Sequence, residues 1–134
     1  MQSRPPPYIL DTHALWWYLK RPILLSETAR NILFHAEAGN GKLIIPAIVV
    51  AELHHITVRA NDPITPTELF SLLDSRSWVE VTPLGPPQLE YLHQLPEIPE
   101  MHDRLIAAEA IIHGAPLLTR DRLISASPNV ETIW

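Results

Sequence analysis

Short apolar runs alternate with longer helical patterns along this chain of 134 residues. Each short run is bounded by polar or turn-forming residues, which predicts a strand. The runs lie at 8–10, 43–45, 78–82, 116–119 and 130–134. Between them, apolar residues recur at the spacing of a helix. The expected helices run from the first strand to about Lys20, from Ser26 to Gly39, from Ile48 to Ala60, after 65–67, from Pro86 to Leu95 and from Asp103 to His113.

The order of these elements predicts the fold class. Strands that alternate with helices form a parallel sheet that is covered by helices on both faces. We therefore expect an α/β protein with a central parallel sheet of four to five strands, folded as a single domain over 1–134. The prolines at 5–7 favour an extended, proline-rich lead-in over 1–7.

Composition excludes several classes of protein. The chain has no cysteine, which rules out Cys-ligated zinc, iron–sulfur clusters, thiol catalysis and disulfide scaffolds. Its formal net charge of −5 argues against a protein that coats DNA through a basic face, but not against a nuclease whose active site gathers carboxylates. No apolar run approaches the roughly 18 to 20 residues needed to cross a bilayer, so we expect a soluble, cytoplasmic protein.

Four acidic residues are expected to meet at one edge of the sheet. Asp11 follows the first strand, Asp121 follows the fourth, and Asp103 opens the helix before the fourth strand. Ligands of open α/β sheets bind at the carboxyl ends of the strands, so Asp11 and Asp121 should be neighbours there. Glu52, on the helix after the second strand, can point to the same edge. The sequence therefore predicts a four-carboxylate cluster.

Such a cluster has two interpretations. Carboxylates this close repel one another, so the cluster needs a cation, and oxygen-only ligands indicate Mg²⁺, with Mn²⁺ as the alternative. A hard divalent ion held in this way supports the chemistry of metal-dependent nucleases. The other interpretation is that Asp11, Asp103 and Asp121 serve only as helix N-caps.

Polar residues beside the acids are candidate substrate ligands. Guanidinium groups match the geometry of phosphate, and the alternative for them is ion pairing at the surface. The arginines that flank two of the acids are Arg104, Arg120 and Arg122. The hydroxyl of Thr119 can help to fix a carboxylate or a bound water, or it can simply end a strand. Whether His13, Glu100 or His102 takes part stays open.

Two adjacent tryptophans occupy the first predicted helix. Successive helical residues diverge by about 100°, so Trp16 and Trp17 cannot both face one core. One of them is a candidate for an exposed apolar groove that fits a dimer interface or the helix of an inhibitory partner. The alternative is that this helix is packed on two sides within one subunit.

Four segments of the chain carry a family resemblance. They are 8–17 (YILDTHALWW), 50–53 (VAEL), 103–110 (DRLIAAEA) and 118–121 (LTRD). In this order and spacing they resemble the PIN-domain family, specifically its VapC-like toxin branch. The resemblance implies a three-layer α/β sandwich and a Mg²⁺-dependent endoribonuclease that acts on RNA, is commonly a homodimer and is inhibited by a cognate antitoxin. It places the family's catalytic, metal-binding acids at Asp11, Glu52, Asp103 and Asp121.

Three other functions compete with a ribonuclease. A phospho-acceptor receiver domain needs a lysine near the last strand edge, whereas Lys20 and Lys42 both lie in the first third of the chain. A phosphatase of the haloacid-dehalogenase type needs an aspartate two residues after its nucleophile, where this chain has His13. An interaction module that keeps the PIN fold without activity is the third, and the presence of all four acids argues against it.

Overall fold

Five parallel strands form the central sheet of the computed structural model, which describes residues 6–134. In chain order the strands are β1 (Pro7–Leu10), β2 (Lys42–Pro46), β3 (Val79–Thr82), β4 (Leu117–Leu118) and β5 (Thr132–Ile133). Their order in the sheet is β3-β2-β1-β4-β5, with Ile9 opposite both Ile44 and Leu117. The predicted α/β class with a parallel sheet is confirmed.

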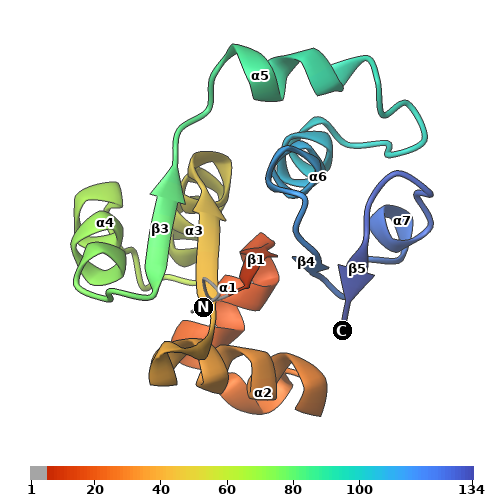
Figure 1. Cartoon of the computed structure of the whole chain (residues 1–134). Helices are drawn as coiled ribbons and strands as arrows, with labels where there is room; N and C mark the ends of the chain where they lie inside the picture. Colours follow the sequence, from red (N-terminus) through yellow and green to blue (C-terminus); the bar gives the residue numbers. More distant parts are fainter. Residues whose placement is uncertain (1–5) are drawn as a thin grey trace.

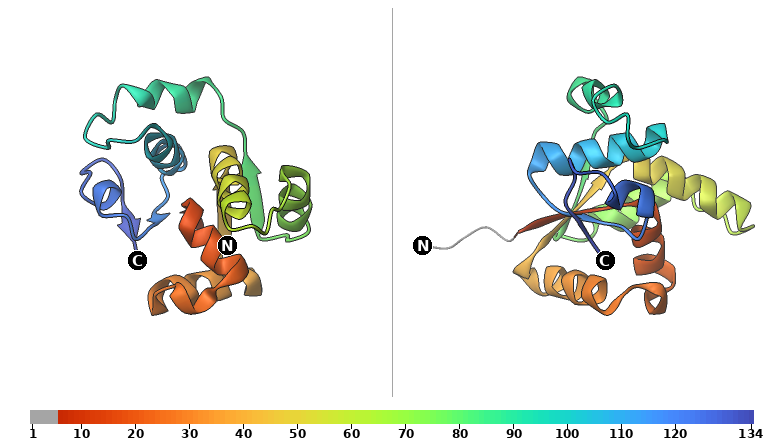
Figure 2. Two further views of the ribbon diagram at one scale, coloured as in Figure 1. Left: turned by 180° about the vertical axis from the view of Figure 1, so that it is seen from behind. Right: turned by 90° about the vertical axis from the view of Figure 1, so that its right-hand side faces the viewer.

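Helices lie on both sides of this sheet, and Figures 1 and 2 show α2 on one side and α5 and α6 on the other. The helices are α1 (Thr12–Lys20), α2 (Glu27–His35), α3 (Ala47–Arg59), α4 (Pro66–Asp74), α5 (Pro86–Leu89), α6 (Met101–His113) and α7 (Arg122–Ser125). Shorter helical turns occupy Pro22–Leu24, Ala36–Asn40 and Glu90–Leu92. As the sequence predicts, the Ser26 hydroxyl caps α2 by accepting from the Ala29 N–H at 3.0 Å. Gly114, with φ of 57°, ends α6 in the left-handed conformation that favours glycine.

The central strands hold the core and fix the position of the residues that follow them. Ile9 and Leu10 of β1 and Leu117 and Leu118 of β4 are fully buried. Parallel strands that are covered on both faces need such apolar runs. The Asp11 N–H donates to the Leu118 carbonyl at 3.2 Å, which carries the pairing of β1 and β4 to the carboxyl ends of both strands.

The helix predicted over 86–95 is shorter in the structure. The helix α5 ends at Leu89, and a 3₁₀ turn continues only to Leu92. Leu95 and Ile98 are 1% and 0% exposed, so they anchor the following loop to the core. The leucine spacing that predicts a longer helix therefore combines a short helix with a buried loop residue.

The prediction also differs from the structure at three short segments. The sequence gives no signal for α7, because four residues with one buried apolar side chain, Ile124, show no periodicity. The strands β4 and β5 have two residues each, fewer than expected. Pro7 belongs to β1 rather than to a lead-in, and the part of the predicted lead-in over 1–5 lies outside the described residues.

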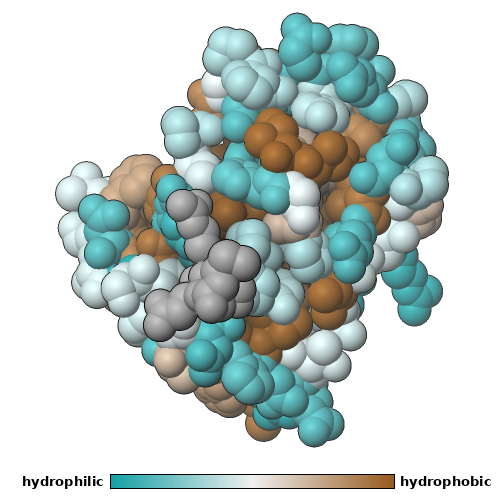
Figure 3. Space-filling model, viewed as in Figure 1, coloured by the Kyte–Doolittle hydropathy of each residue, from teal (hydrophilic) through white to brown (hydrophobic). Residues whose placement is uncertain are grey.

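Apolar side chains reach the surface at several separate places. The most exposed large ones include Ile23 and Phe34, at 79% and 56%. On the face shown in Figure 3, hydrophobic surface forms several patches among hydrophilic residues. Trp17 is buried and Trp16 is half-buried against the same core, which agrees with a helix packed on two sides within the subunit. Within residues 6–134, no helix has the length and apolar character needed to cross a membrane.

Candidate active site

Asp11 lies where the direction of strand addition reverses. The chain adds β2 and β3 on one side of β1 and β4 and β5 on the other, and ligands of open α/β sheets bind at such a point. Asp11 Oδ1 accepts from the Ala14 N–H at 2.8 Å and caps α1, while Oδ2 accepts from the hydroxyl of Thr119. Burial raises the pKa of Asp11 above its usual value, and these two hydrogen bonds oppose the rise.

Asp121 follows β4 and is fixed by the same hydroxyl. Its Oδ1 accepts from the N–H groups of Leu123 and Ile124 at 2.8 and 3.1 Å and caps α7. Its own N–H donates to Thr119 Oγ1 at 3.0 Å. Thr119 is 1% exposed and does not line the pocket, so it orients the Asp11 carboxylate and is not placed to bind substrate.

Glu52 and Asp103 come to the same place from helices α3 and α6. Glu52 Oε1 accepts from the hydroxyl of Thr12 at 2.8 Å, and its other carboxylate oxygen lies 3.8 Å from His102 Nδ1. The same nitrogen lies 3.9 Å from a carboxylate oxygen of Glu100. Asp103 lies in the first turn of α6, which begins at Met101, so the capping interpretation is wrong for this residue.

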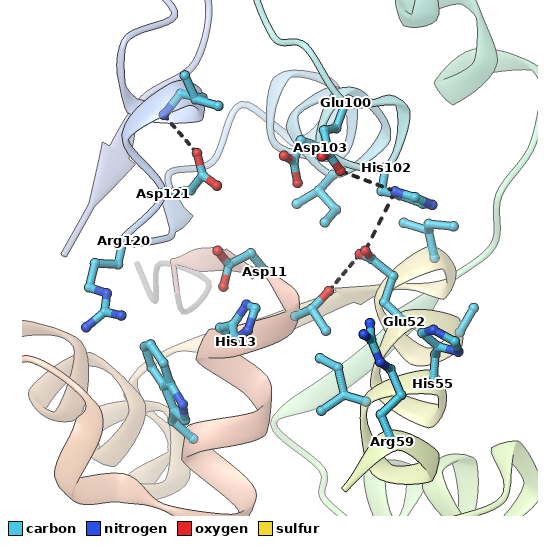
Figure 4. Close-up of a pocket in the computed structure, with 17 residues that line it drawn as sticks. Asp11, His13, Glu52, His55, Arg59, Glu100, His102, Asp103, Arg120 and Asp121 are labelled. Carbon is cyan, nitrogen blue, oxygen red and sulfur yellow. Dashed lines mark hydrogen bonds and ion pairs between the residues drawn. The ribbon is translucent and has the colours of Figure 1, made fainter.

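The acids share one electrostatic environment, which the pKa of Asp103 reveals. This pKa is raised from 3.8 to about 6. Burial is the largest cause, because a low-dielectric surrounding disfavours the charged form. Repulsion by neighbouring carboxylates adds to it, in the order Asp121, Glu52, Glu100 and Asp11. The carboxylates predicted from the sequence are therefore close enough to influence one another, as Figure 4 shows.

All four predicted acids line one pocket of about 920 Å³. Its walls also carry aromatic and apolar side chains, among them Trp17, Ile48, Ile56, Ile106 and Leu123. Glu100, His13 and His102 face the same space. The pocket thus combines an acidic centre with walls on which an organic ligand can rest.

The three arginines expected to bind substrate occupy different environments. The Arg120 guanidinium lies 4.8 Å from the ring centroid of Trp17 and lines the pocket. Arg104 donates to the carbonyls of Ile98 and Leu92 at 2.6 and 2.7 Å and does not line it. Arg122 is exposed on α7, away from the pocket lining. Arg104 therefore ties α6 to the loop that precedes it.

Two basic residues of the pocket were not among the predicted site residues, His55 and Arg59. Both belong to α3 and are exposed. They follow Glu52 by three and seven residues, a spacing that keeps side chains on one face of a helix. This spacing is visible in the sequence and is the signal that could have identified them.

The chemistry of the donor set fits a hard divalent cation. Its atoms are all carboxylate oxygens, and their mutual repulsion favours a bound positive charge. Within residues 6–134, no three acidic or histidine side chains already converge to the spacing of a metal site. The acids therefore have the type of ligand atom that Mg²⁺ prefers, and their side chains would have to move closer together to coordinate one ion.

Most of this chain is similar in sequence to known proteins. The PIN domain family model matches residues 8–127, which include all four acids. Ribonuclease VapC22 of Mycobacterium tuberculosis is 29% identical over 130 residues, or 94% of this chain and 97% of that protein.

Solved structures share the fold. One is VapBC2 from Rickettsia felis, bound to a DNA fragment from its own promoter. It matches with a TM-score of 0.72 and 22% identity, over 95% of this chain and 97% of that one. A toxin–antitoxin complex from Klebsiella pneumoniae matches with a TM-score of 0.62 and 19% identity over 92% and 94%. Because the family model spans most of the sequence and contains the whole acidic cluster, this chain belongs to the PIN domain family.

Proposed function

We propose that this protein is a Mg²⁺-dependent endoribonuclease and the toxin of a toxin–antitoxin pair. The proposal rests on the convergence of Asp11, Glu52, Asp103 and Asp121, from four separate segments, on one pocket. The raised pKa of Asp103 supports it, because a cation would relieve the repulsion that contributes to this rise. The similarity to Ribonuclease VapC22 supports RNA as the substrate.

The four acids would hold Mg²⁺, or alternatively Mn²⁺, and two hydroxyl groups would orient them. When bound, such an ion supplies an activated water and neutralises the charge that develops on a phosphoryl group. Thr119 holds Asp11 and the backbone of Asp121, while Thr12 holds Glu52. Hydrogen bonds of this kind orient carboxylates before a metal ion binds to them.

Arg120 is the proposed ligand for a substrate phosphate. Its stacking on the Trp17 ring keeps the guanidinium at the pocket wall and does not use its N–H donors. These donors can bind phosphate oxygens beside the acids. Arg104, which donates to two carbonyls, and Arg122, which lies outside the pocket lining, are not assigned this role.

A cognate antitoxin is the proposed protein partner. The similarity in fold to the toxin–antitoxin complex from Klebsiella pneumoniae supports this partner. A homodimer and a cytoplasmic location remain predictions that come from the sequence.

Cleavage of a mixed pool of structured RNA in Mg²⁺, Mn²⁺ or EDTA tests the proposed activity. Asp103→Asn is the decisive variant, because the pKa of Asp103 responds to burial and charge rather than to a hydrogen bond. The change therefore removes a charge from the pocket without breaking such a contact. Asp62→Asn is the matched control, since Asp62 is exposed and does not line the pocket.

We expect cleavage that needs the divalent ion, is lost in Asp103→Asn and is kept in Asp62→Asn. Cleavage that persists in EDTA or in Asp103→Asn would contradict the proposal. If the wild-type protein neither cleaves RNA nor binds Mg²⁺ or Mn²⁺ in calorimetry, an interaction module that has kept the fold without activity becomes the better interpretation.

A further inference from the structure

One face of α3 forms a wall of the pocket along most of the helix. The pocket-lining residues of this helix recur three or four positions apart, as one helical face requires. They are Ile48, Ala51, Glu52, His55, Ile56 and Arg59. The residues that α3 buries in the core lie elsewhere on the helix, at Val49, Val50, Leu53 and Thr57. At about 1.5 Å per residue, the wall extends for about 16 Å and is therefore longer than a single catalytic centre.

Charge changes sign along this wall. Glu52 lies at the acidic centre, whereas His55 and Arg59 are exposed on the next two turns. Arg59 lies about 10 Å beyond Glu52 along the helix axis. That separation places Arg59 beside the acidic centre and not within it.

Arg120 lines the pocket on the other side of the acids from α3. Figure 4 shows Arg120 on one side of the carboxylates, His55 and Arg59 on the other, and His13 between them beside Asp11. In a chain of net charge −5, this places an arginine on each flank of the acidic centre. A polyanion that crosses the pocket would meet positive charge before and after the acids, which is the complementarity that a nucleic-acid strand requires.

We propose that the α3 face from Glu52 to Arg59 binds the nucleotide next to the cleaved bond of a single-stranded RNA. Arg59 binds a phosphate of this nucleotide, and the exposed imidazole of His55 stacks on its base. Unpaired bases stack on aromatic side chains and on histidine, and a base held inside a duplex cannot do so. This inference rests on the proposed function, since it assigns the catalytic centre to the acids.

Binding of a fluorescent 12-nucleotide RNA of randomised sequence, followed by anisotropy in Mg²⁺, tests the proposal. Every protein carries Asp103→Asn, so that the RNA stays intact. Arg59→Gln should weaken binding and reduce the slope of log K against log salt by about 0.7, the value for one lost phosphate contact on a single strand. The loss of affinity should therefore become about threefold smaller between 50 and 200 mM salt. Arg21→Gln is the matched control, because Arg21 is exposed and does not line the pocket.

Stacking by His55 has its own variants. His55→Ala should weaken binding about fivefold or more, because base stacking contributes at least about 1 kcal/mol. His55→Phe should restore the affinity, since it keeps an aromatic face without the imidazole nitrogens. Both positions are exposed on α3, and thermal melting of each variant checks that the fold is retained.

The outcomes separate this inference from the proposed function. If Arg59→Gln and Arg21→Gln bind RNA equally well, or if the protein does not bind the RNA, the α3 face is not a nucleotide site and is left to a protein partner. Metal-dependent cleavage by the wild-type protein would still support the ribonuclease in that case. Conversely, binding that depends on Arg59 and His55 in a protein that never cleaves RNA would keep the α3 face as an RNA-binding site and overturn the proposed activity.

Discussion

The two halves of the acidic site are held in place by different means. At the strand ends, Asp11 and Asp121 cap helices and meet at the buried hydroxyl of Thr119. On the helices, Glu52 accepts one hydroxyl hydrogen bond. Asp103 is half-buried on α6, where neighbouring carboxylates repel it. The backbone therefore fixes the first half, whereas the second half depends on the packing of α3 against α6 and on what enters the pocket.

Thr119→Val should give the largest loss of stability, because it attacks the fixed half. Valine keeps the shape of threonine but removes the donor to Asp11 and the acceptor for the Asp121 N–H. Buried groups left without partners, one of them a carboxylate, should lower the free energy of unfolding by about 2 to 3 kcal/mol. Urea unfolding of the metal-free protein measures this change.

Thr119→Ser is the control, since it keeps the hydroxyl and removes only a methyl group. It should retain most of the stability that Thr119→Val loses. Equal stability of the valine and serine variants would mean that the hydroxyl does not hold the strand-end half together.

Asp103→Asn should have the opposite sign and stabilise the metal-free protein at pH 7. Folding raises the pKa of Asp103 from about 4 in the unfolded chain to about 6. Protonated Asp103 is therefore compatible with the fold below about pH 4, and its ionisation lowers the free energy of unfolding as the pH rises through about 6. Asparagine carries no such charge. Because Asp103 is only half-buried, solvent screens part of this effect, and we expect a gain of about 1 to 2 kcal/mol at pH 7.

Unfolding in EDTA at pH 4 and pH 7 measures this effect. The difference between Asp103→Asn and the wild-type protein should shrink towards zero at pH 4, where Asp103 is largely protonated in the folded state. Asp62→Asn, at an exposed position, should show no such dependence. A gain that is equal at both pH values would show that the ionisation of Asp103 in its buried, acidic surrounding is not the cause of the gain.

Thr12→Val should weaken the helix half by a smaller amount. It removes the 2.8 Å hydrogen bond to Glu52, whose half-buried carboxylate can still be reached by water. We expect a loss of about 0.5 to 1 kcal/mol in urea unfolding. Thr12→Ser should recover it, and a loss as large as that of Thr119→Val would contradict the distinction between the two halves.

The strand-end half was largely predictable from the sequence because it is local. An aspartate between an apolar run and a helical pattern indicates both a cap and the carboxyl end of a strand, and Asp11 fulfils both roles. The same logic failed for the cap role of Asp103, since α6 begins two residues earlier, at Met101. A boundary shift of half a turn moves a side chain from the end of a helix onto its face.

Contacts across the pocket depend on paths that the sequence does not encode locally. Arg104 was a candidate substrate ligand, yet it donates to Ile98 and Leu92 because the loop after α5 folds back against α6. That path follows from the burial of Leu95 and Ile98 in a core formed by distant strands. The position of Arg59 in the pocket likewise requires knowledge of which face of α3 the core covers.

The smallest expected effect separates two arginines that flank Asp121. Arg120 lines the pocket and stacks on Trp17, whereas Arg122 is exposed outside the pocket lining. In an Asp103→Asn background, Arg120→Gln should reduce the slope of log K against log salt for single-stranded RNA by about 0.7, and Arg122→Gln should leave it unchanged. Between 50 and 200 mM salt, the ratio of the affinity without this substitution to that of Arg120→Gln should therefore fall about threefold. Arg120→Lys should keep the slope because it keeps the charge, so equal slopes for the two glutamine variants would place the substrate phosphates away from the strand-end half.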